Sequence, residues 1–189
     1  MAGALLVGFW LISTAVPEVS APAEAPRPQL LEAAGGIAAN AGGMGLSSLV
    51  VVAFEKPVFV SQAFFVGFTA KAEWRLQSAV QYSRNGLDLL AGLRAGVLLG
   101  RAFELFFAFG AGAAGVVSRS STTFHGWFVA DQFGIGFQAG LGARLRVGER
   151  VSLVIVPAEL LGDFWPLGGL GGSLVAADFT AYAGLSVSL

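Results

Sequence analysis

Strict two-residue alternation of apolar and polar side chains is the feature that most constrains the fold of this chain. Over residues 134–148 every odd position is apolar and every even position is polar or glycine. Residues 178–189 repeat the pattern, and residues 87–99 follow it with few exceptions. Successive side chains of a β-strand point to opposite faces, so each segment predicts a strand with one apolar and one polar face.

The composition places the apolar faces against lipid. The 189 residues are 55% hydrophobic and only 12% charged, with a mean hydropathy of +0.72. Only helices and closed barrels cross a bilayer, because every backbone polar group must be satisfied inside the protein. A spanning helix needs about 20 apolar residues, whereas charges interrupt most of this chain at about strand-length intervals. The sequence therefore predicts an all-β fold, a transmembrane up-and-down antiparallel β-barrel that is closed and filled by side chains.

Turn residues divide the chain into eight expected strands. They span residues 31–42, 47–55, 58–72, 86–99, 102–117, 133–147, 151–163 and 176–189. Tight connections are expected at 55–57, 100–101 and 148–150, with a short link at 43–46 and longer loops at 73–85, 118–132 and 164–175. An even strand count with alternating short and long connections is typical of bacterial outer-membrane barrels.

The first thirty residues differ in character from the rest. An apolar core at Leu5 to Ile12 and the small residues Ala21-Pro22-Ala23 are typical of a secretory signal peptide. We expect a signal peptide over 1–23, a Pro-rich linker over 24–30 and the barrel over 31–189.

A glycine motif admits a second interpretation. Gly110, Gly112 and Gly115 have the spacing of a dinucleotide-binding turn, and Asp131 lies downstream. Such a turn requires a helix to follow, but the next residues are β-branched or hydroxyl-bearing, which favours a strand. The net charge of −1 provides no basic field for nucleic acid. A chain with no Cys and one His offers no thiolate or multi-histidine metal site, and no cofactor is expected.

Aromatic residues gather where the strands are expected to meet the long loops. Aromatic rings prefer the headgroup level of a bilayer, so these residues predict an outer aromatic girdle. Its members are Trp74, Trp127, Phe128 and Trp165.

The pattern and strand count resemble the small eight-stranded outer-membrane barrels of the outer-membrane-protein-A transmembrane-domain type. The last strand is similar to that family's assembly signal at Tyr182, Gly184, Val187 and Leu189, although the family usually ends in an aromatic residue. The resemblance implies a location in the outer membrane of a Gram-negative bacterium and recognition by the barrel insertion machinery. The lipid bilayer and lipopolysaccharide are the other expected partners, and a monomer is expected.

Charged and polar side chains on the inner faces predict a polar network in the lumen. Eight strands enclose an interior that side chains fill, so a structural plug of ion pairs is the simplest interpretation, with an ion path as the alternative. The expected members are Arg94, Glu104, Gln138, Arg144, Arg146, Glu159 and Tyr182.

A catalytic role has one weak candidate set in the loop over 118–132. His125, Ser121 and Asp131 supply a base, a nucleophile and an acid by residue type. The triplet His125-Gly126-Trp127 differs from the His-x-Ser element of lipid A deacylase barrels, so no catalysis is expected. We expect a structural or surface-interaction role, with loops that carry Arg75, Arg84 and Arg119 at the outer surface.

Overall fold

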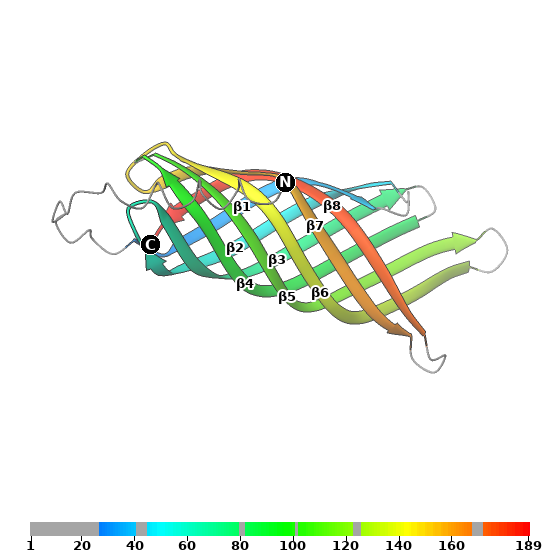
Figure 1. Cartoon of the computed structure of the whole chain (residues 1–189). Coiled ribbons are helices and arrows are strands. Elements are labelled where there is room, and N and C mark those ends of the chain that lie inside the picture. Colours follow the sequence, from blue (N-terminus) through cyan, green and yellow to red (C-terminus); the bar gives the residue numbers. More distant parts are fainter. Residues whose placement is uncertain (1–26, 41–44, 80–81, 101, 123–125, 168–171) are drawn as a thin grey trace, which may run out of the picture.

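The computed structural model describes residues 27–40, 45–79, 82–100, 102–122, 126–167 and 172–189. They form the strands β1 (Leu30–Asn40), β2 (Leu46–Val60), β3 (Phe64–Ala79), β4 (Tyr82–Leu99), β5 (Phe103–Thr122), β6 (Gly126–Arg146), β7 (Val151–Leu167) and β8 (Gly172–Ser188). Neighbouring strands pair antiparallel, and β1 pairs with β8, so the sheet closes into a barrel (Figure 1). The predicted closed eight-stranded up-and-down barrel is confirmed. Within these residues, no helix is long and apolar enough to cross a membrane.

The two-residue alternation separates an outer from an inner surface. On β4, the side chains of Leu87 and Leu89 are 47% and 55% exposed, whereas Asp88 and Arg94 are 0% and 3% exposed. Around the barrel the outer face is apolar, whereas the interior holds most of the charged side chains together with one cluster of apolar and aromatic side chains. The members of that cluster are Leu49, Val51, Phe65, Phe106, Val154, Val156 and Tyr182. An outer surface of this kind suits lipid, and the inner surface then has to satisfy its own charges.

Glycines let β4 and β5 approach closely. A Cβ atom at Gly112 would lie 1.9 Å from the carbonyl oxygen of Leu89, and one at Gly92 would lie 2.0 Å from that of Phe109. Either contact would push the two strands apart. The G-x-G-x-x-G segment is part of β5, so the strand interpretation of this motif is confirmed.

At the end of the barrel opposite the short turns, the strands are longer and the loops shorter than predicted. Residues expected as loops at 73–85, 118–132 and 164–175 largely belong to strands, and β5 pairs with β6 as far as Thr122 opposite Gly126. In Figure 1 the β5–β6 hairpin projects past most of the barrel rim. The prediction ended each strand where the apolar alternation stopped. A strand that leaves the lipid no longer needs an apolar outer face, so it continues without that signal.

The turn between β2 and β3 was predicted at 55–57 and lies six residues later. Pro57 stays within β2, where the register shifts between Pro57 and Phe59. A bulge of this kind accommodates the missing N–H of proline. The chain turns at residues 61–63, where the Ser61 hydroxyl accepts hydrogen bonds from the backbone N–H groups of Ala63 and Phe64 at 3.3 and 3.0 Å. The predicted signal peptide lies outside the described residues.

Candidate functional site

The barrel interior holds three groups of charged and polar side chains that follow one another from the short-turn end to the long-hairpin end. β3 shows part of this order, because it begins at the short-turn end with Phe64, reaches the second group at Lys71 and reaches the third group at Arg75. We name the groups the arginine cluster, the lysine cluster and the aspartate cluster. The arginine cluster contains Arg27, Glu32, Glu55, Arg94, Glu104 and Arg144. The lysine cluster contains Lys71, Glu73, Gln138, Glu159, Thr180 and Tyr182. The aspartate cluster contains Asn40, Arg75, Asp88, Asp163 and Asp178.

In the arginine cluster, three guanidinium groups face three glutamates. Arg94 binds Glu32 through both terminal nitrogens, at 2.5 and 3.0 Å, and Glu55 at 2.8 Å. Arg144 donates to Glu55 at 2.7 Å and to Glu104 at 2.8 Å, and it also contacts Glu32. The numbers of arginines and glutamates are equal, and each glutamate contacts at least two arginines, which is the arrangement that buried ions require.

Arg27 precedes β1 and closes the short-turn end of this cluster. Its guanidinium donates to Glu104 at 2.5 Å and lies 3.8 Å from the ring centroid of Phe65. Burial lowers the pKa of the Arg27 guanidinium from its ordinary value, and the charges of Glu104 and Glu55 oppose that shift. The segment is also held through its backbone, because the N–H of Leu189 donates to the carbonyl oxygen of Gln29 at 2.9 Å.

The lysine cluster is centred on one ammonium group. Lys71 Nζ lies 2.5 Å from Glu159, 2.6 Å from Glu73 and 2.8 Å from the amide oxygen of Gln138. Hydroxyl groups of Thr180 and Tyr182 donate to Glu159 at 3.1 and 3.4 Å. One cation is thus shared by two carboxylates in the middle of the barrel.

The aspartate cluster places three carboxylates around one guanidinium. Arg75 donates to Asp88 at 2.6 Å and to Asp163 at 2.8 Å, and it also contacts Asp178. Asn40 donates to Asp178 at 2.7 Å. Lys71 and Arg75 together therefore face five carboxyl groups, so acidic side chains outnumber basic ones in the lysine and aspartate clusters. Among the described residues, no group of three or more His, Cys, Asp or Glu side chains is arranged to hold a metal ion.

Most residues predicted for the lumen network lie in these clusters. The structure places Arg94, Glu104, Gln138, Arg144, Glu159 and Tyr182 in the interior. Arg146 differs, because it is exposed at the end of β6. It shares the face of Arg144 but lies past the point where neighbouring strands enclose the lumen.

Sequence reasoning missed a large part of the interior. Arg75 was assigned to an outside loop, yet it is 5% exposed in the centre of the aspartate cluster. The signal was present, because Lys71, Glu73 and Arg75 alternate with Ala72 and Trp74, but it fell across a predicted strand end. Glu55 was assigned to a turn. The buried ionic residues absent from the predicted network are Glu32, Glu55, Lys71, Glu73, Arg75, Asp88, Asp163 and Asp178.

The structure does not bring two of the weak catalytic candidates, Ser121 and Asp131, together. His125 lies outside the described residues. In the β5–β6 register, Ser121 is opposite Trp127 and Asp131 is opposite Val117. Ser121 and Asp131 are therefore four residue steps apart along the ladder, or about 13 Å at a strand rise of about 3.3 Å.

The residues predicted for the aromatic girdle lie on β3, β6 and β7. The residues predicted for the assembly signal lie on or just after β8, the strand that closes the barrel against β1. Trp74 is 51% exposed on the outer face of β3. Trp127 and Phe128 belong to β6 and Trp165 to β7, with side chains outside the described set. On β8, Tyr182 points inward at 6% exposure, whereas Val187 and Leu189 are exposed. A Cβ atom at Gly184 would lie 2.1 Å from the carbonyl oxygen of Ala33 on β1, so this glycine permits the closing contact.

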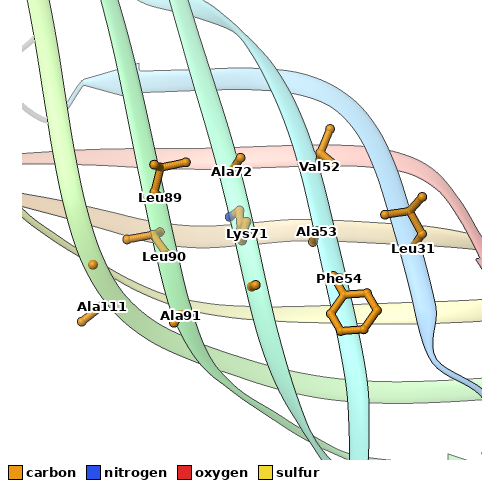
Figure 2. Close-up of a pocket in the computed structure, with 12 residues that line it drawn as sticks. Leu31, Val52, Ala53, Phe54, Lys71, Ala72, Leu89, Leu90, Ala91 and Ala111 are labelled. Atoms are coloured by element: carbon orange, nitrogen blue, oxygen red, sulfur yellow. The ribbon is translucent and has the colours of Figure 1, made fainter.

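Two of the hollows on the outer surface share the strands β2, β3 and β4, and the apolar one of them also reaches β1 and β5. The apolar hollow has a volume of about 470 Å³, and Figure 2 shows Ala72 between the longer side chains of Val52 and Leu89. Its lining is Leu31, Val52, Ala53, Phe54, Ala70, Lys71, Ala72, Leu89, Leu90, Ala91, Ala111 and Gly112. The polar hollow has a volume of about 450 Å³ and lies nearer the long hairpins. Its lining is Leu46, Ser48, Leu76, Gln77, Ser78, Ser83 and Asn85.

Solved structures with the same fold are small outer-membrane barrels. The chain is similar to the Neisserial surface protein A, NspA, with a TM-score of 0.54 and 11% identity over 85% of this chain and 96% of that one. It is similar to the outer membrane enzyme PagL, with a TM-score of 0.54 and 14% identity over 85% and 99% of the two chains. The N-terminal β-barrel domain of Pseudomonas aeruginosa OprF gives a TM-score of 0.47 and 14% identity over 88% and 100%.

The likenesses to NspA and PagL confirm the predicted architecture, a small closed β-barrel with the fold of those two outer-membrane proteins. At such low identity they show the fold alone. No protein-family model matches the sequence, and no curated protein is significantly similar to it.

Proposed function

We propose that this chain is an integral protein of the bacterial outer membrane with a structural and surface-interaction role, and that it catalyses no reaction. The observation that carries the proposal is the inversion of burial, with apolar side chains on the outside and paired charges on the inside. A soluble barrel would bury the former and expose the latter. A lipid-embedded barrel with a filled lumen needs this inverted order.

The height of the apolar surface agrees with a bilayer. On β4, the outward side chains are apolar from Leu87 to Leu99, and the next outward residues toward the long hairpin are Asn85 and Ser83. Twelve residue steps at a rise of about 3.3 Å and a strand tilt of about 40° give a band of roughly 30 Å. The apolar band of outer-membrane barrels is about 25 Å tall, so β4 is long enough to cross the membrane and continue beyond it.

The interior supports a closed barrel over an open channel. The three clusters cross the lumen at successive levels, and the arginine cluster joins β1, β2, β4, β5 and β6 by ion pairs. Moving water and ions through this space would require several buried pairs to separate. Breaking one buried pair costs about 3–5 kcal/mol, which makes spontaneous opening rare.

The β5–β6 hairpin is the part of the barrel that best fits a surface-interaction role. Beyond Gly115 and Phe133, which are paired near the edge of the apolar band, its two strands continue for seven further paired positions. We propose that this extension contacts the sugar portion of lipopolysaccharide or the surface of another cell. On one side β5 stays paired with β4 as far as Ser120, whereas the described pairing of β6 with β7 begins at Ile135. The hairpin therefore extends past the closed wall on its β6 side, and interaction is the simplest reason for that length.

Two measurements test the proposal. In fractionated cells, the folded protein is expected in the outer membrane and is expected to migrate differently on a gel before and after boiling. Replacing residues 119–129 by a two-residue turn is expected to leave that heat-dependent shift intact and to reduce adhesion or membrane integrity. An intact shift with unchanged adhesion and integrity would contradict the interaction role while leaving the barrel assignment in place.

A further inference from the structure

The apolar and polar hollows share the strands β2, β3 and β4 and follow one another along them. The apolar hollow uses residues 52–54 of β2, 70–72 of β3 and 89–91 of β4. The polar hollow uses Leu46 and Ser48 of β2, residues 76–78 of β3, and Ser83 and Asn85 of β4. One row of side chains separates them, in which Trp74 is paired with Val50 on one side and Leu87 on the other. The two hollows therefore lie in line along the barrel wall, with the exposed side chain of Trp74 between them.

The apolar hollow offers a surface for hydrocarbon. Ala70, Ala91 and Ala111 are exposed and small, and the larger side chains of Phe54 and Leu89 stand beside them. The one charged residue in its lining is Lys71, whose ammonium group points to the interior and binds Glu159 at 2.5 Å. The ammonium group of Lys71 therefore contributes no charge to the hollow. A volume of about 470 Å³ is ample for one extended acyl chain segment.

The polar hollow has hydroxyl and amide groups and no charged side chain in its lining. Ser48, Ser78 and Asn85 are exposed on the outward face, and Ser83 is half-buried. Neutral donors and acceptors of this kind suit sugar hydroxyls, whereas a phosphate favours Arg or Lys partners. The chemistry of the lining therefore selects an uncharged, hydroxyl-rich head over an anionic one.

The spacing of the hollows fits a single amphiphile. Phe54 in the apolar hollow and Ser48 in the polar hollow are six residues apart, which corresponds to roughly 15 Å along the bilayer normal at a rise of about 3.3 Å and a tilt of about 40°. Trp74 lies between them, at the level where an indole ring prefers the lipid headgroup region. A polar head above Trp74 and a chain below it is the order that a lipid of the outer leaflet presents.

We propose that the β2–β4 wall is a binding site for one glycolipid, with an acyl chain in the apolar hollow and an uncharged sugar in the polar hollow. The proposal rests on the proposed placement of the outer surface in a bilayer. It goes further by naming a lipid class and a site whose polar part includes no residue of the β5–β6 hairpin. Bound lipid would be held at one side of the barrel instead of exchanging equally around its circumference.

The test uses the full chain folded into phosphatidylcholine vesicles that contain equal amounts of a glucosyl diacylglycerol and phosphatidylglycerol. After gentle detergent extraction, native mass spectrometry measures which lipid stays bound. The expected result is one retained glycolipid per monomer, enriched about tenfold over phosphatidylglycerol. Ala91→Leu, which fills the apolar hollow, and Asn85→Leu, which removes a polar group from the other hollow, are each expected to abolish that enrichment.

Ala183→Leu is the matched control, because Ala183 is exposed on the outer face of β8, away from the hollows. It is expected to keep the enrichment. Equal retention of both lipids, preference for phosphatidylglycerol, or a lipid-free dimer that Ala91→Leu disrupts would each overturn the proposal. The heat-dependent gel shift is recorded for every variant. Loss of the shift in the unsubstituted chain would contradict the membrane barrel itself, whereas an intact shift without glycolipid enrichment contradicts only the lipid site.

Discussion

Replacing Arg144 by glutamine is expected to destabilise the barrel strongly. Arg144 is 2% exposed and contacts Glu32, Glu55 and Glu104 in the arginine cluster. Arg144→Gln would leave three buried glutamates with two arginines, so one negative charge would lack compensation. The glutamine side chain cannot supply a positive charge, although its amide can still donate hydrogen bonds.

The size of the stability loss depends on the ion pairs that the three glutamates keep after Arg144 is replaced. Removing one partner of a buried ion pair typically costs about 3–5 kcal/mol. Glu32 and Glu55 would keep Arg94, and Glu104 would keep Arg27, so no carboxylate loses its last partner. We therefore expect a loss near the lower limit, about 3 kcal/mol of unfolding free energy.

Urea unfolding of the barrel in vesicles, followed by tryptophan fluorescence, measures this loss. With a urea dependence of about 1–3 kcal/mol per molar, the midpoint is expected to fall by about 1–3 M. Arg146→Gln is the matched control, because Arg146 lies two residues away on the same strand and is exposed. Its effect is expected to stay within about 0.5 kcal/mol. Adding Glu104→Gln to Arg144→Gln restores equal charge and is expected to recover about 1 kcal/mol. Equal, small effects of Arg144→Gln and Arg146→Gln would refute the reasoning.

Three other variants test the close packing of β4 against β5, the depth of Trp74 in the bilayer and the absence of lipid-modifying activity. Gly112→Ala places a Cβ 1.9 Å from a backbone oxygen and is expected to cost about 1–3 kcal/mol in urea unfolding, whereas Gly148→Ala, with no atom within 4 Å, is expected to change nothing. Trp74→Phe is expected to reduce fluorescence quenching by lipids brominated near the headgroup but not at the chain end, and the opposite depth dependence would contradict the girdle assignment. His125→Ala is expected to leave the lipid A mass spectrum of producing cells unchanged, and an altered acyl chain count would show a lipid-modifying activity.

The fold was predictable from the sequence because lipid imposes a local rule. Every outward residue in the bilayer has to be apolar, so the face of each side chain can be read from its neighbours two positions away. The segments 87–99 and 134–148 show this rule over their whole length, and both lie largely within observed strands. The rule stops at the membrane surface, which is why the extension of β5 and β6 to residues 122 and 126 was not predicted.

The interior was predictable only in part, because its contacts join strands that are distant in sequence. Alternation places Arg94 and Arg144 on the inner face, but nothing local indicates that both bind Glu32 at the start of the barrel. Glu55 was misplaced because it lies two residues before a proline, a residue that more often marks a turn than a bulge. Arg27 was assigned to a linker, and its position in the lumen depends on how the chain enters β1. Partners of this kind follow from barrel closure and not from spacing.

Site-directed spin labelling along β5 tests the central claim, that an apolar outer surface faces lipid and that the side chains of the opposite face fill the barrel interior. The chain contains no cysteine, so single cysteines can be introduced at residues 105–109 and labelled one at a time in vesicles. Leu105, Phe107 and Phe109 are 42–50% exposed, whereas Phe106 and Ala108 are 4% and 6% exposed. Labels at the odd positions are expected to collide readily with dissolved oxygen in the lipid, and labels at the even positions are expected to be immobile and protected. Uniform accessibility at all five positions, or the opposite phase, would contradict the account.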